Sequence, residues 1–157
     1  MNFNIMLAAV LFLAGWLWSY LFLKQFIYNF TVALPLVNKM MESSDQIIYP
    51  TAKKFTWVSI TANFFVCGLI CFVVLWFVPM YLKLSFIAGA LIAILMSIKD
   101  LSYKNRKMFD SFCGAYYRFV PDDELRTAMY NKKPSQMKVR LHAMELPYEW
   151  IPKFDAD

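Results

Sequence analysis

Few residues in this chain have the types and spacing that catalysis or metal binding requires. The single histidine, His142, lies in a basic stretch with Lys138 and Arg140. One histidine cannot hold a haem from both sides, and no group of His, Cys, Asp and Glu residues has the spacing of a metal site. We therefore expect His142 to lie on the surface and the chain to use no metal or cofactor.

The acids and thiols also point to structure rather than to an enzyme. The acidic run 122–124 follows Pro121. A proline followed by acids is typical of the first turn of a helix, so we interpret the run as a cap. Cys113 has no base beside it in the sequence, and Cys67 and Cys71 lie one helical turn apart in an apolar run. We expect neither a disulfide framework nor catalytic activity.

The elements that carry these residues are apolar helices. Of the 157 residues, 60% are hydrophobic, and no charged residue occurs between Phe55 and Leu82. A bilayer core is crossed by about 20 apolar residues at ~1.5 Å rise each. The stretch 55–98 therefore predicts a hairpin of two membrane-spanning helices, joined by a turn at 77–81.

A further uncharged run, from Phe3 to Leu23, predicts the first span, over residues 1–24. It lacks the basic start and the small-residue cleavage site of a signal peptide. Residues 25–54 form a cytoplasmic or interfacial connector, which either continues this helix with a kink at Pro35 or forms a second helix in the interface. The predicted fold class is an all-α integral membrane protein with three transmembrane helices and a small helical cytoplasmic tail.

The last span is short. Leu84–Ile98 is uncharged and covers only about 22 Å as a helix. Lys83 would lengthen it if its ammonium reached the interface along an apolar stem. The alternative is a re-entrant segment, which would place the tail on the other side of the membrane.

Small or weakly polar residues recur every four positions on both hairpin helices. Residues four apart share a helix face, and membrane helices associate where small residues let their backbones approach. The two stripes either face each other or face a partner helix or another copy of the chain. For Asn63, a hydrogen bond between helices is expected rather than a transport role. The helix-packing stripes are Ser59, Asn63, Cys67 and Cys71 on the first helix and Ser85, Gly89, Ala93 and Ser97 on the second.

Lysine and arginine are concentrated in the connector and at the start of the tail, whereas the hairpin turn holds only Lys83. The positive-inside rule then places the amino terminus outside and the carboxyl terminus in the cytoplasm, and we expect a bacterial inner (cytoplasmic) membrane. We attribute the net charge of +5 to this distribution of lysine and arginine across the membrane, and we expect no nucleic-acid binding. The residues expected at the membrane interface are Trp16, Trp18, Trp57, Trp76, Lys83, Lys104, Arg106 and Lys107.

The tail, 99–157, is predicted to be basic, amphipathic and helical. We expect it to begin as an extension of the last span, to continue with a helix from Pro121 to about Tyr130, and to pack on the connector. For 136–144 the alternation fits a strand and the spacing fits a helix capped by Ser135; we favour the helix because no second strand is available. The aromatic residues of the last segment either fold back or bind a partner: Tyr148, Trp150 and Phe154.

These features predict a non-catalytic membrane protein that acts by protein–protein interaction. It would be an accessory subunit, or a small regulator or exclusion factor, of a larger membrane protein or complex, with lipid around it. A second hypothesis is a homo-oligomeric pore, because the layout is similar to that of one class of holins, although the long tail departs from it. A third is a membrane enzyme or transporter fragment, which no motif supports; coupled transporters usually carry ionisable groups in their spans.

Overall fold

The computed structural model describes residues 3–154, and within them the chain is all-helical, with 78% helix and no strand. Three helices are long and apolar enough to cross a membrane, namely Phe3–Ser43, Thr51–Phe77 and Met80–Ile98. The predicted all-α class and the three long apolar helices are thus confirmed. The first helix continues well beyond the predicted first span, which selects a continued helix over a separate interfacial one.

The chain divides into two compact units. One, which we call the span unit, comprises residues 3–28 and 59–100. The other, the tail unit, comprises residues 29–58 and 101–154. The connector and the tail therefore fold together, which is the packing that we expected.

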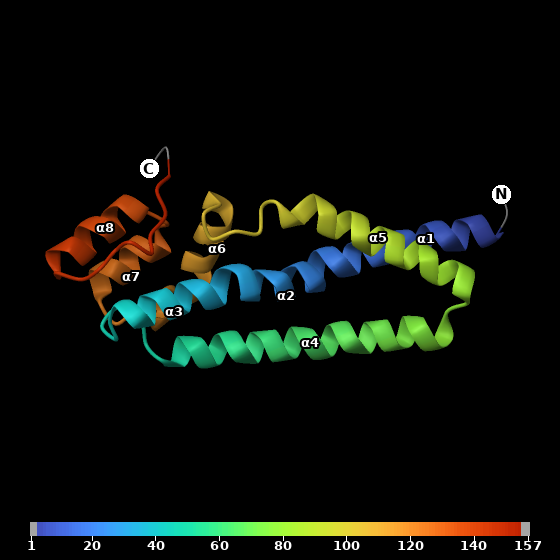
Figure 1. The fold of residues 1–157 in the computed structure, drawn as a ribbon, viewed down its shortest axis with the longest axis horizontal. Helices are drawn as coiled ribbons and strands as arrows, with labels where there is room; N and C mark the ends of the chain where they lie inside the picture. The colour runs from blue at the N-terminus through green and yellow to red at the C-terminus, as the bar shows by residue number, and fades with distance from the viewer. Residues whose placement is uncertain (1–2, 155–157) are drawn as a thin grey trace. The chain divides into compact units, whose positions relative to one another are not determined.

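The first helical run consists, in order, of α1 (Phe3–Trp18), η1 (Ser19–Leu23), α2 (Lys24–Tyr28), η2 (Asn29–Ala33) and α3 (Leu34–Ser43) (Figure 1). Both η segments are π-helical. Pro35 lies in the first turn of α3, directly after η2. Proline lacks an N–H and crowds the preceding turn, so a change of helical register just before it lets the helix continue.

Glycines bring α1 and α5 (Met80–Ile98) into backbone contact within the span unit (Figure 1). A Cβ added at Gly15 would collide with the backbone carbonyl of Phe86. One added at Gly89 would collide with that of Phe12. Trp18 packs over Phe86 with ring centroids 5.4 Å apart. The absence of side chains at the two glycines is what permits this close crossing.

The predicted hairpin turn is present between α4 (Thr51–Phe77) and α5. Pro79 cannot continue α4, and it disfavours helical geometry at Val78 before it. Its own carbonyl then accepts hydrogen bonds from the amides of Leu82 and Lys83, at 3.0 and 3.1 Å, and so starts α5. Only 6% of the most apolar window of α4 is buried within the chain, so its surface faces outward.

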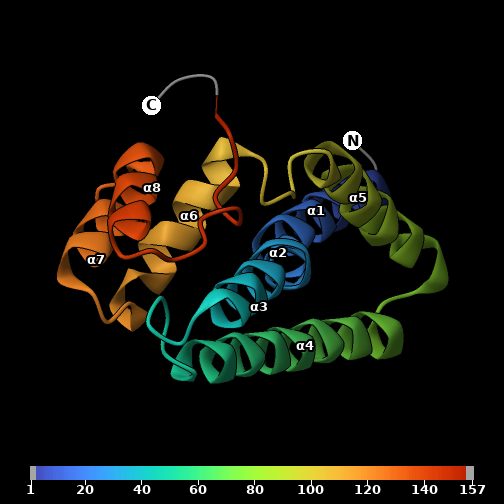
Figure 2. The ribbon, with the colours of Figure 1, turned by 60° about the vertical axis from the view of Figure 1, so that its left-hand side comes forward.

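Three α-helices and a short 3-10 turn form the later part of the tail unit: α6 (Arg106–Tyr116), η3 (Tyr117–Phe119), α7 (Asp123–Tyr130) and α8 (Pro134–Ala143). In Figure 2, α7 and α8 lie side by side. Asp122 caps α7 by accepting from the amide of Leu125 at 2.8 Å, and Asn105 caps α6 by accepting from that of Lys107 at 3.0 Å. The predicted cap and helix after Pro121 are confirmed.

The tail unit has a core to which the connector and the tail both contribute. Tyr49 donates its amide to the carbonyl of Phe119 at 2.8 Å, which ties the two segments together. The hydroxyl of Thr56 donates to the carbonyl of Ala52, so the Tyr116 hydroxyl donates to Thr56, at 2.7 Å. The largest fully buried apolar side chains of the unit are Leu36, Met40, Ile47, Ile48, Phe109, Phe112, Leu125, Met129, Met137 and Leu141.

Two details of the predicted tail are wrong. The last span does not extend into it, because α5 ends at Ile98 and α6 begins only at Arg106. Polar side chains compete for the backbone in between: the Ser102 hydroxyl accepts from the amide of Lys104, at 3.3 Å. Residues 136–144 are helical for the most part, but Pro134 occupies the first turn of α8, so Ser135 lies inside the helix and is not its cap.

Candidate functional site

Most of the side chains that could take part in a reaction have a structural role instead. Cys113 is fully buried in α6, and burial raises the pKa of its thiol to about 12, so little thiolate exists at neutral pH. His142 is exposed on α8, with the ring of Tyr148 6.2 Å from it. Within residues 3–154, no three His, Cys, Asp or Glu residues come together in a way that would hold a metal ion.

The acidic run at the start of α7 is tied to an arginine of α8. Arg140 donates to both carboxylate oxygens of Asp122, at 2.7 and 3.0 Å, and pairs with Glu124 at 2.9 Å. Hydrogen bonding from Arg140 lowers the pKa of Asp122 below its ordinary value. Asp123 pairs with Arg126 on its own helix, at 2.8 Å. Asp122 and Glu124 thus tie the start of α7 to α8 through Arg140 instead of forming a reactive pair.

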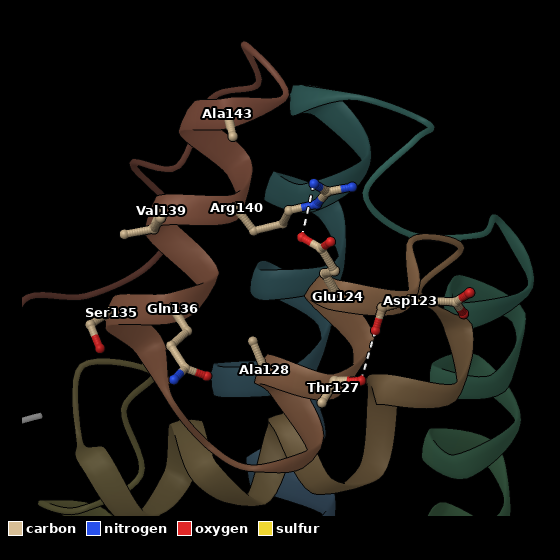
Figure 3. A pocket seen from close by; sticks show the side chains of 9 residues that line it. All are labelled: Asp123, Glu124, Thr127, Ala128, Ser135, Gln136, Val139, Arg140 and Ala143. Atoms are coloured by element: carbon tan, nitrogen blue, oxygen red, sulfur yellow. Dashed lines mark hydrogen bonds and ion pairs between the residues drawn. The ribbon is translucent and has the colours of Figure 1, made fainter.

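A hollow of about 570 Å³ lies between α7 and α8, and Figure 3 shows Arg140 reaching across it to Glu124. The Thr127 hydroxyl donates to the backbone carbonyl of Asp123 at 2.8 Å, so it is not poised as a nucleophile. Val139 is 70% exposed beside it. The residues lining the hollow are Asp123, Glu124, Thr127, Ala128, Ser135, Gln136, Val139, Arg140 and Ala143.

A second pocket, of about 660 Å³, has a basic lining, and we call it the basic pocket. Its wall combines α3, the loop after α5, α8 and the last segment of the chain. Lys39 donates to the Tyr103 hydroxyl at 3.2 Å, and its ammonium also lies 4.4 Å from the centre of that ring. The lining residues are Lys39, Tyr103, Lys104, Lys138, Tyr148, Glu149, Trp150, Ile151, Pro152 and Lys153.

Of the aromatic residues of the last segment, two fold back and one is exposed. Trp150 is only 3% exposed, and Phe154 packs on Phe109 with ring centroids 5.4 Å apart, so both fold back onto the tail unit. Tyr148 remains 40% exposed. Of the three partner-binding candidates, Tyr148 alone keeps a large surface for another molecule.

The helix-packing stripes have different surroundings. On α5, Gly89, Ala93 and Ser97 are buried and Ser85 is half-buried, and α5 packs extensively with α1. The α4 stripe, Ser59, Asn63, Cys67 and Cys71, is half-buried. Among the described residues α4 makes no extensive packing with α5, so the two stripes do not form a common interface.

Asn63 retains an open acceptor on α4. Its side-chain amide donates to the backbone carbonyl of Ser59 at 2.8 Å, one turn earlier in the same helix. No donor within residues 3–154 bonds to its side-chain carbonyl oxygen. In an apolar setting an amide oxygen without a donor is costly, so this oxygen favours a donor from another molecule.

The residues expected at a membrane interface are either exposed or half-buried in the structure. Trp16 stacks on Tyr20 at 5.5 Å, and Trp57 meets Phe30 edge-on at 6.4 Å. Arg106 serves the tail unit, since it pairs with Asp110 at 3.0 Å and donates to the carbonyl of Lys132. The exposed members are Trp57, Trp76, Lys104 and Lys107, and the half-buried ones are Trp16, Trp18, Lys83 and Arg106.

No protein-family model matches the chain, no curated protein matches it, and no solved structure matches it. Function therefore has to be argued from its own residues.

Sequence reasoning missed the basic pocket as a unit. Lys39, Tyr103, Lys138 and Lys153 lie on four segments, and no spacing within one segment could have grouped them.

Proposed function

We propose that the chain is an integral protein of a bacterial cytoplasmic membrane that acts by binding a larger membrane protein, as an accessory subunit or a small regulator. Support for insertion comes from α4, whose apolar side chains are turned outward along most of its length. Phe65, Leu69 and Trp76 are all more than half exposed. In water such a surface would be a strong aggregation liability, whereas lipid tails solvate it at no cost.

The tail unit is built from both the connector and the tail, and this supports the proposed topology. If α5 were re-entrant, the tail would lie on the opposite side from the connector. The two segments instead share one core, through contacts such as that between Thr56 and Tyr116. Two full crossings by α4 and α5 return the chain to the same side, and the lysine distribution makes that side the cytoplasm.

The observation that carries the interaction role is Asn63 on the weakly covered helix α4. Its side-chain oxygen has no donor from the described residues, and the helix around it is largely free of intramolecular packing. Hydrogen bonds between membrane helices contribute roughly 0.6–2 kcal/mol each. A donor on a partner helix that reaches the half-buried stripe of α4 would satisfy Asn63.

Native purification in a mild detergent, followed by mass analysis, tests the proposal. We expect a heterologous membrane protein at fixed stoichiometry. Asn63→Leu should weaken the association by about 3- to 30-fold, the affinity equivalent of the lost hydrogen bond. Thr61→Val is the matched control, because Thr61 is exposed and lies on a different face of α4.

Equal losses of partner in both variants would contradict a role for Asn63. Recovery of the wild-type chain only as a homo-oligomer would contradict the heterologous partner and favour the pore hypothesis. Recovery as a bare monomer under conditions that retain native complexes would contradict a stable subunit role.

A further inference from the structure

The basic pocket carries an inference that goes beyond a protein partner. Four segments of the tail unit bring lysines to one concavity: Lys39 from α3, Lys104 from the loop after α5, Lys138 from α8 and Lys153 from the last segment. Among the described residues, Glu149 is the one carboxylate in the lining. The pocket therefore gathers a clear excess of positive charge.

These lysines are not neutralised within residues 3–154, where no ion pair joins any of them to a carboxylate. Lys39 is held by a neutral hydroxyl, that of Tyr103, and Lys138 donates to the neutral carbonyl of Pro152 at 3.3 Å. By contrast, three arginines of the same unit pair with carboxylates: Arg106 with Asp110, Arg126 with Asp123 and Arg140 with Asp122. Like charges gathered in one concavity repel each other and attract an anion.

Trp150 forms part of the wall of the basic pocket. It is 97% buried, and its indole N–H has no hydrogen-bond partner among the described residues, although most buried donors are paired. This N–H is itself covered from solvent, so what Trp150 contributes to the pocket is an apolar wall beside the lysines.

We propose that the basic pocket binds an anionic phosphate group with an organic substituent. Lysine ammoniums are compact point charges that suit phosphate, and they here surround a space of about 660 Å³, which is in the range of small-molecule sites. The Tyr103 hydroxyl adds a polar group beside Lys39. Glu149 at the rim disfavours a ligand carrying negative charge along its whole length.

Two sources supply this chemistry: the headgroup of an anionic phospholipid and a soluble phosphate ester. Basic sites on the cytoplasmic side of membrane proteins commonly bind anionic headgroups. The lipid source thus rests on the proposed membrane insertion, whereas binding of a soluble phosphate ester does not.

The test measures ligand binding by the full-length protein in two arms. One arm uses nanodiscs of phosphatidylcholine with or without phosphatidylglycerol, read by lipid retention in native mass spectrometry. The other titrates glycerol 3-phosphate into detergent-solubilised protein, read by calorimetry. The test variant is Lys104→Gln with Lys153→Gln, since both side chains are exposed and their loss leaves the fold intact. The control is Lys132→Gln with Lys133→Gln, which removes the same charge from exposed positions that lie outside the pocket and are not among the residues expected at the membrane interface.

We expect the pocket variant to weaken binding by about 10-fold or more and the control to change it by less than about 2-fold. Lys39→Gln should weaken binding as well, which provides a second variant at the inner wall. Selective loss in the nanodisc arm identifies a lipid headgroup, and selective loss in the calorimetric arm identifies a soluble ester. Equal loss in pocket and control variants, or binding in neither arm, overturns the proposal. Recovery of each protein in the nanodisc fraction reports insertion separately, so a failure of insertion is distinguished from a loss of lipid binding.

Discussion

The span unit and the tail unit place similar side chains in opposite environments. In the tail unit Phe112 and Tyr116 stack at 4.6 Å inside a core and are almost fully buried. In the span unit Phe72 and Trp76 stack at 5.8 Å on the outside of α4, where both are more than half exposed. The first pair is stabilised by removal from water, whereas the second needs an apolar solvent. One chain thus combines a buried aromatic core with an outward-facing apolar helix, which fits the proposed membrane insertion.

Specificity also has different origins in the two units. Caps and ion pairs fix the helices of the tail unit, as Asp122 does by holding both the amide of Leu125 and the side chain of Arg140. In the span unit, close backbone approach at Gly15 and Gly89 fixes α1 against α5. In the tail unit, polar contacts between specific residues determine how the helices pack. In the span unit, where the contacting surfaces are apolar, the helices pack where their shapes are complementary.

The largest expected effect comes from exchanging a phenylalanine for alanine in each unit. Phe112→Ala empties part of the tail-unit core and should lower the free energy of unfolding by about 3–5 kcal/mol. Phe72→Ala should change it by less than about 1 kcal/mol, because that side chain is 57% exposed. Denaturant unfolding in mild detergent, followed by circular dichroism, measures both. Similar losses in the two variants would remove the contrast between the units.

A smaller effect should follow from filling the glycine contact. Gly89→Leu places a side chain against the backbone of Phe12 and should destabilise the span unit by about 1–3 kcal/mol through overpacking. Gly68→Leu is the control, since a Cβ at Gly68 meets no atom within 4 Å. Disulfide crosslinking between cysteines placed on α1 and α5 would report whether the pair still forms. Unchanged crosslinking in Gly89→Leu would show that the contact does not hold the helices.

The features predicted correctly from sequence are those encoded by neighbouring residues. A long uncharged run specifies α4, Pro79 ends it, and Asp122 after Pro121 caps the next helix. Each signal needs only one segment of chain, because hydrogen bonding and backbone sterics act locally. The all-helical class and the three long apolar helices follow from such signals.

The features that sequence could not provide depend on which segments meet. Gly15 and Ser19 are small residues four positions apart, but this local pattern does not say which helix they meet, and the contact of Gly15 with α5 appears only in the structure. The break between Ile98 and Arg106 depends on side chains such as Ser102 competing for backbone amides. The basic pocket is the clearest case, because Lys39 and Lys138 become neighbours of one cavity only after the connector and the tail fold together.

The smallest effect concerns the polar ties of the tail unit. Asp122→Ala should lower the free energy of unfolding by about 0.5–2 kcal/mol at neutral pH through loss of the cap. Arg140 holds the pKa of Asp122 below its ordinary value of about 3.9, so this contribution is present above that pH and disappears as the pH falls through the lower, folded value. The difference between wild type and Asp122→Ala should therefore shrink below about pH 4. Asp123→Ala is the control, because that side chain is 89% exposed and its pairing is worth little. If Asp122→Ala and Asp123→Ala lowered the free energy of unfolding equally, the cap would have no special role. If the difference between wild type and Asp122→Ala did not change with pH down to acid unfolding, the ion pair with Arg140 would have none. Either result would mean that caps and ion pairs do not distinguish the tail unit from the span unit.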